Sequence, residues 1–171
     1  CLTGFITPLV PFAERRIIGM KLYNKVIFVG ESGTNRSAMA EAIFKEYHLT
    51  RPVEIERRGM VALFPEPINQ KAEAVLISNG IEVENHMSTQ LKDEDFSEDT
   101  LMIVMEEVHR ERVLKDHENA NPENVQVLTG LVGDELEIIN PYGGTLQVYG
   151  LCYETLNKSL KKLADKMNEG E

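Results

Sequence analysis

The chain has 171 residues, of which 42% are hydrophobic and 27% are charged, a balance typical of one soluble globular domain. Its formal net charge of −10 argues against general binding to nucleic acid or to an anionic membrane, because both require clustered Lys and Arg. Two cysteines, Cys1 and Cys152, are too few for a disulfide framework, and no Cys/His cluster has metal-site spacing. We therefore expect no metal or other cofactor, and a reducing, cytoplasmic location.

The first 19 residues differ in character from the rest. Pro8 and Pro11 interrupt the apolar run, and Arg15 and Arg16 follow it, which is the wrong order for a secretory signal. We predict that residues 1–19 are a disordered extension and that residues 20–168 are one domain. Met20 is the expected natural start, with the preceding residues contributed by upstream translation or by an added sequence.

Strand and helix patterns alternate from there to the end of the chain. Short apolar runs predict strands at residues 25–29, 53–56, 101–105 and 125–128. Helical spacing predicts helices at residues 38–47, 69–78, 107–117 and 145–167, the last with Leu151, Leu156, Leu160 and Leu163 on its apolar face. The expected fold class is α/β, a doubly wound four-stranded parallel sheet with helices on both faces.

Residues 30–37 (GESGTNRS) form the turn from the first strand into the first helix, a frequent ligand site in open parallel sheets. The unpaired amides and the dipole of a helix N-terminus favour an anion, and the planar fork of Arg36 is suited to a phosphate. A structural interpretation remains open, in which Gly30 and Gly33 permit a tight turn and Arg36 is a solvated residue. Because an arginine in the first helical turn opposes the dipole, we expect Arg36 to have an anionic partner.

The run VIFVGESGTNRSAMAEAIF resembles the signature of low-molecular-weight protein tyrosine phosphatases, in which a strand is followed by Cys, five residues, Arg and Ser or Thr. Residues 79–91, 101–109 and 140–146 resemble further segments of that family, in the same order. The resemblance spans roughly residues 25–163. It implies the phosphatase fold described above, hydrolysis of phosphoric monoesters on proteins, and a phosphate-binding loop made of Glu31, Ser32, Gly33, Thr34, Asn35, Arg36 and Ser37.

Two positions that carry the family's chemistry are changed. The nucleophilic cysteine falls on Gly30, which has no side chain, and the general-acid aspartate falls on Asn140, which cannot transfer a proton at neutral pH. We therefore predict a pseudophosphatase that binds phosphate, or a phosphorylated small molecule or protein, without hydrolysing it. The alternatives are an active phosphatase with non-standard groups and an interaction domain kept for its fold.

The remaining candidate residues have open roles. Ser32 and Thr34 are poor nucleophiles without a base, and no histidine is placed by the sequence to serve them. Ser37 either contacts a ligand or water, or caps the helix, which is the favoured role. Tyr142 is expected on the pocket rim, and Glu31 would weaken phosphate binding if it pointed inward. The sequence does not indicate an oligomeric state.

Overall fold

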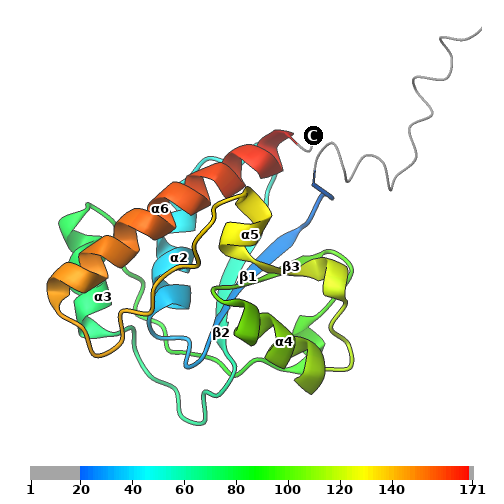
Figure 1. Cartoon of the computed structure of the whole chain (residues 1–171), viewed down its shortest axis with the longest axis horizontal. Helices are drawn as coiled ribbons and strands as arrows, with labels where there is room; N and C mark the ends of the chain where they lie inside the picture. Colours follow the sequence, from blue (N-terminus) through cyan, green and yellow to red (C-terminus); the bar gives the residue numbers. More distant parts are fainter. Residues whose placement is uncertain (1–19, 170–171) are drawn as a thin grey trace, which may run out of the picture.

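Four parallel strands form the centre of the structure, a computed structural model that describes residues 20–169 (Figure 1). They are β1 (Lys25–Gly30), β2 (Glu54–Gly59), β3 (Thr100–Val104) and β4 (Val125–Val127), in the sheet order β2-β1-β3-β4. Every neighbouring pair is parallel, which confirms the predicted fold class. The expected extension at residues 1–19 lies outside the described residues.

Helices cover both faces of this sheet because its central strands are apolar on both sides. Val26 and Phe28 of β1 pack into the core beneath α2 (Arg36–Phe44), α3 (Gln70–Ser78), α5 (Leu128–Val132) and α6 (Leu146–Glu169). Ile27 and Val29 face the second core, which is covered by α4 (Glu107–Asp116). Figure 1 shows α6 crossing over α2 and α3, with α4 set apart from them. Two short 3₁₀ helices, Asp93–Asp95 and Pro122–Asn124, complete the described elements. Between residues 20 and 169, no helix combines the length and the apolar character needed to span a membrane.

Apart from shifts of a few residues at element ends, the structure differs from the sequence prediction in three features. β2 runs to Gly59 rather than ending near residue 56, because the strand stays paired with β1 as far as Gly30 and the charges of Arg57 and Arg58 are satisfied by acidic partners. The short helix α5 was not predicted. Leu151, assigned to the apolar face of the last helix, is 62% exposed, so that part of the prediction is wrong.

Candidate functional site

The loop at residues 30–37 is held by hydrogen bonds from two neighbouring segments. The amides of Met60 and Val61, just after β2, donate to the carbonyls of Gly30 and Glu31 at 2.8 Å each. The amide of Asn69, just before α3, donates to the carbonyl of Thr34 at 3.0 Å. These three loop carbonyls are therefore directed away from the centre of the loop, toward the neighbouring segments. That geometry leaves loop amides available to face the centre.

Close packing of two glycines shapes the same loop. Gly33 has a φ of +78°, and a Cβ placed on it would lie 3.1 Å from the backbone nitrogen of Gly59. A Cβ on Gly59 would lie 2.6 Å from the carbonyl carbon of Ser32, too close for any side chain. The turn therefore requires the end of β2 to be glycine, and at Gly33 the left-handed backbone conformation itself favours glycine.

A pocket of about 310 Å³ brings the predicted site residues together. Its lining contains Gly30, Glu31, Ser32, Gly33, Thr34, Asn35, Arg36, Ser37, Glu66, Asn140 and Tyr142. Ten of these eleven residues were named from the sequence, although Asn140 and Tyr142 lie more than a hundred residues beyond the loop. Glu66 was missed, because the segment that follows β2 has no motif that marks its carboxylate.

The hydroxyl of Ser37 faces the position where a nucleophile would stand. A Cβ built on Gly30 would lie 2.9 Å from Ser37 Oγ, and this oxygen is fully buried with no hydrogen-bond partner among the described residues. Asn35, not Ser37, is the N-cap of α2, and its side chain makes no capping bond. The predicted capping role of Ser37 is therefore wrong. Its buried oxygen is left to a ligand or to water, since an unpaired buried hydroxyl is unfavourable.

Arg36 lines the pocket but already has acceptors within the protein. Its guanidinium donates to Glu106 Oε2 at 2.5 Å and to the carbonyl of Ile138 at 2.6 Å, and the residue is only 6% exposed. The anionic partner that we expected for Arg36 is thus supplied by the protein itself. A guanidinium has five N–H donors, so these two bonds leave other donors for a ligand.

His109 lies beside this ion pair. Its Nε2 is 3.7 Å from Glu106 and 3.8 Å from Glu31, while its buried Nδ1 has no partner within the described chain. Burial lowers the pKa of His109, more than the adjacent carboxylates raise it, so the imidazole is neutral at pH 7. The sequence analysis did not predict a histidine at this place. The ion-pair contacts of His109 are with carboxylates, whereas the hydroxyls of Ser32 and Thr34 bond to each other at 2.7 Å.

Asn140 and Tyr142 belong to a tight turn at the pocket mouth. The side-chain oxygen of Asn140 accepts a hydrogen bond from the amide of Tyr142 at 3.1 Å, an interaction that an aspartate could also make. The ring of Tyr142 is 75% exposed, as expected for a residue on the rim. The side chain of Asn140 therefore stabilises this turn, and its amide carries no acidic proton at neutral pH.

Two residues of α6 support the loop from below. The hydroxyl of buried Tyr149 donates to Asn35 Oδ1 at 2.9 Å, which ties the start of α2 to α6. The thiol of Cys152 is fully buried 3.8 Å from the carbonyl of Ile139, and burial raises its pKa to about 12. A thiol that stays protonated and inaccessible cannot act as a nucleophile in this pocket. Cys152 is therefore a structural residue.

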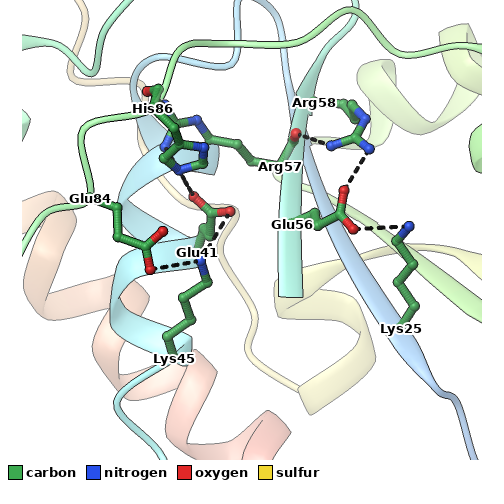
Figure 2. Close-up of polar contacts among 8 residues, drawn as sticks. All are labelled: Lys25, Glu41, Lys45, Glu56, Arg57, Arg58, Glu84 and His86. Atoms are coloured by element: carbon green, nitrogen blue, oxygen red, sulfur yellow. Dashed lines mark hydrogen bonds and ion pairs between the residues drawn. The ribbon is translucent and has the colours of Figure 1, made fainter. Parts of the chain in front are cut away.

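A buried ion cluster fixes α2 against β2. Figure 2 shows Glu41 of α2 directed toward His86 and Arg57. Its Oε1 lies 3.0 Å from both Arg57 NH1 and His86 Nε2, and Glu41 and Arg57 are both buried. The ion cluster thereby fixes the position of α2, which carries Arg36 and Ser37, relative to β2, which ends at Gly59. No group of three His, Cys, Asp or Glu side chains within residues 20–169 is arranged to hold a metal ion.

Comparison with known proteins identifies the class. A sequence profile described as "Low molecular weight phosphotyrosine protein phosphatase" matches residues 25–171. A protein-arginine-phosphatase of Geobacillus stearothermophilus is 28% identical over 143 residues, covering 84% of this chain and 95% of that protein. The low-molecular-weight protein-tyrosine-phosphatase PtpB of Staphylococcus aureus is 30% identical over 141 residues, covering 82% and 97%.

A solved structure agrees with these sequence matches. The YwlE arginine phosphatase from Geobacillus stearothermophilus superposes with a TM-score of 0.78 at 28% identity, covering 85% of this chain and 94% of that one. The chain therefore belongs to the low-molecular-weight phosphotyrosine protein phosphatase family.

Proposed function

We propose that this protein is a pseudophosphatase, a family member that binds a phosphorylated protein side chain in the loop at residues 30–37 without hydrolysing it. Residues 20–168 are taken to form the binding domain, with residues 1–19 as an extension and the cytoplasm as the site of action. Relatives named as arginine and tyrosine phosphatases make phosphoarginine and phosphotyrosine the two side chains to test.

The absence of two reacting groups supports the lack of turnover. Attack on phosphorus requires a nucleophile at the centre of the loop, and departure of the product requires a proton. Gly30 and Asn140 supply neither. Among the described residues, Ser32 and Thr34 hydrogen-bond to each other and no base contacts them, so neither alcohol is activated.

The buried hydroxyl of Ser37 is the observation that carries the binding proposal. It is fully buried, lacks a partner in the described structure and lines the loop pocket. In addition, the amides of residues 32–35 donate to no backbone or side-chain acceptor within residues 20–169. A phosphoryl oxygen would accept hydrogen bonds from these groups, which otherwise depend on water.

The ion pair between Arg36 and Glu106 favours the competing interpretation, a domain kept for its fold. An arginine with internal acceptors needs no ligand to explain its presence. That interpretation, however, leaves the buried Ser37 hydroxyl and the open loop amides without a role. An active phosphatase with non-standard groups has no comparable support.

The proposal is tested by titrating the purified protein with inorganic phosphate, phosphotyrosine and phosphoarginine while loop amide resonances are followed by NMR. We expect saturable shifts centred on residues 31–37 and no phosphate release in a parallel assay. Ser37→Ala should weaken binding while leaving the fold intact, because it removes only the unpaired hydroxyl. Arg36→Lys should weaken binding further, since a lysine loses the fork geometry.

Three results would count against the proposal. Phosphate release that survives purification and disappears in Thr34→Ala or Ser32→Ala would indicate an active enzyme. An absence of resonance shifts at tens of millimolar phosphate would indicate a domain kept for its fold. Shifts that Ser37→Ala leaves unchanged would place the ligand elsewhere.

A further inference from the structure

The mouth of the loop pocket carries negative charge, although the proposed ligand is an anion. Glu31 and Glu66 line the pocket, and both are exposed, the side chain of Glu31 by 65%. They come from separate segments, the loop itself and the connection after β2. Among the described residues that line the pocket, Arg36 alone is a cation, and it is buried and paired with Glu106.

Neither exposed carboxylate is neutralised by another side chain of the described residues. Within residues 20–169, the only ion-pair contact of Glu31 is with His109 at 3.8 Å, and Glu66 has none. His109 is a weak counterion, because its burial lowers its pKa and leaves it uncharged at pH 7. The rim therefore presents two uncompensated negative charges around a loop whose interior presents N–H and O–H donors.

One aromatic side chain lines the pocket together with these carboxylates. Tyr142 lines the pocket, and its side chain is 75% exposed. Exposed aromatic rings of this kind are typical of interaction sites, and they also attract Arg and Lys through cation–π contacts.

We propose that this rim, made of Glu31, Glu66 and Tyr142, selects phosphorylated protein segments that carry Arg or Lys next to the phosphorylated residue. The inference rests on the proposed function, because it assigns the deep loop to the phosphoryl group and the rim to the neighbouring cations. The buried hydroxyl of Ser37, unpartnered and directed into the same pocket, is the separate observation that a polar ligand enters it. An acidic segment would be disfavoured by like-charge repulsion at the rim.

The size of the preference follows from the exposure of the two glutamates. An exposed ion pair contributes roughly a two- to fivefold change in affinity, so two pairs give about 4- to 25-fold between basic and neutral segments. Repulsion widens the ratio between basic and acidic segments beyond that. Because surface charges are screened, the preference should shrink as salt rises from about 0.05 M to 0.5 M.

The experiment uses the full chain and three phosphotyrosine peptides that share one core and are flanked by Lys/Arg, by Ser/Gly or by Asp/Glu. Calorimetry should rank them basic, neutral, acidic, with at least tenfold between the extremes at low salt. The double variant Glu31→Gln/Glu66→Gln should reduce that ratio to about threefold or less and should improve the affinity for inorganic phosphate. Glu118→Gln is the matched control, because this exposed glutamate follows the far end of α4, about 15 Å from the end nearest the pocket, and should change nothing.

The outcomes separate this inference from the proposed function. If inorganic phosphate and all three peptides fail to bind, the proposed function is wrong. If phosphate binds but the three peptides have equal affinities, the selective rim is wrong and the proposed function stands. If an unphosphorylated basic peptide binds as tightly as its phosphorylated form, the pocket binds cations and the inference is also wrong.

Discussion

The proposed assignment of Gly30 and Asn140 to the nucleophile and acid positions predicts that Gly30→Cys/Asn140→Asp should convert the protein into a phosphatase. In Gly30→Cys/Asn140→Asp, the new Cβ would lie 2.9 Å from Ser37 Oγ and 3.3 Å from Ser37 Cβ. These atoms belong to one small side chain that can rotate, so accommodation requires only a local shift. The new sulfur would then stand within reach of the buried Ser37 hydroxyl. Giving that hydroxyl a partner recovers part of a desolvation cost of about 1–3 kcal/mol, and we expect the net change in the free energy of unfolding to be within about 1 kcal/mol.

The activity of the restored protein should depend on both substitutions. The amides of the loop and the dipole of α2 should lower the pKa of the new thiol below about 8.5 and yield a thiolate at neutral pH. General-acid catalysis contributes typically about 10²–10⁴ in rate, so the double variant should exceed Gly30→Cys by that factor on phosphotyrosine, whose leaving group needs a proton. The factor should be smaller on an aryl phosphate with an acidic phenol.

Stopped-flow detection of the phenol burst measures this directly. Gly30→Ala and Gly30→Ser are the matched controls, because they introduce the same Cβ without a thiol. Adding Glu31→Thr to the double variant would relieve the repulsion between Glu31 and an anionic substrate. Adding Gly33→Asn is less suitable, because the new Cβ would lie 3.1 Å from the backbone nitrogen of Gly59. A folded double variant that binds phosphate yet gives no burst, with or without Glu31→Thr, would refute the phosphatase-like geometry of this loop.

Three further predictions concern the framework of the site. Gly59→Ala should cost about 1–3 kcal/mol in urea unfolding and weaken phosphate binding, because its Cβ would lie 2.6 Å from a backbone carbon; Gly150→Ala, which meets no atom within 4 Å, should be neutral or stabilising. Glu41→Ala should cost about 3–5 kcal/mol by leaving its buried arginine partner unpaired, whereas Glu84→Gln, at an exposed ion pair, should cost less than about 1 kcal/mol. His109 has a lowered pKa in the folded protein, so the stability that depends on its neutral form is fully present above about pH 6.5 and is lost as the pH falls through the folded-state pKa. His109→Gln should therefore make the free energy of unfolding depend less on pH between about pH 7 and 5.

The sequence predicted the fold well because the central strands β1 and β3 are buried on both faces and are therefore almost entirely apolar. The strand at residues 101–105, observed as Thr100–Val104, is the clearest case. It predicted the end of β2 poorly, because Arg57 and Arg58 do not look like strand residues. Their place in the sheet depends on ion pairs with Glu41, Glu56 and Asp95. Glu41 and Asp95 are distant in the sequence, so these two ion pairs leave no local pattern.

The residues of the candidate site also fall into a predictable and an unpredictable group. The residues of the loop were predictable because one contiguous motif carries them. The ion pair of Arg36 with Glu106 and the position of His109 were not predictable, since they depend on how α4 docks beside the loop, 70 residues later in the chain. The structure places Tyr149 in the core, where its hydroxyl supports Asn35, and no local sequence pattern marks that contact.

Gly30 and Glu31 together determine the distribution of charge in the loop. A thiolate at position 30 would place a negative charge at the centre of the loop, in competition with a phosphoryl group. Gly30 removes that charge, and the adjacent Glu31 places one at the rim, where it is exposed to solvent. The interior of the loop therefore presents hydrogen-bond donors, and the mouth of the pocket presents carboxylates. A ligand that matches this gradient is negative at its tip and positive around it, which describes a phosphorylated residue in a basic segment better than a free phosphate ion.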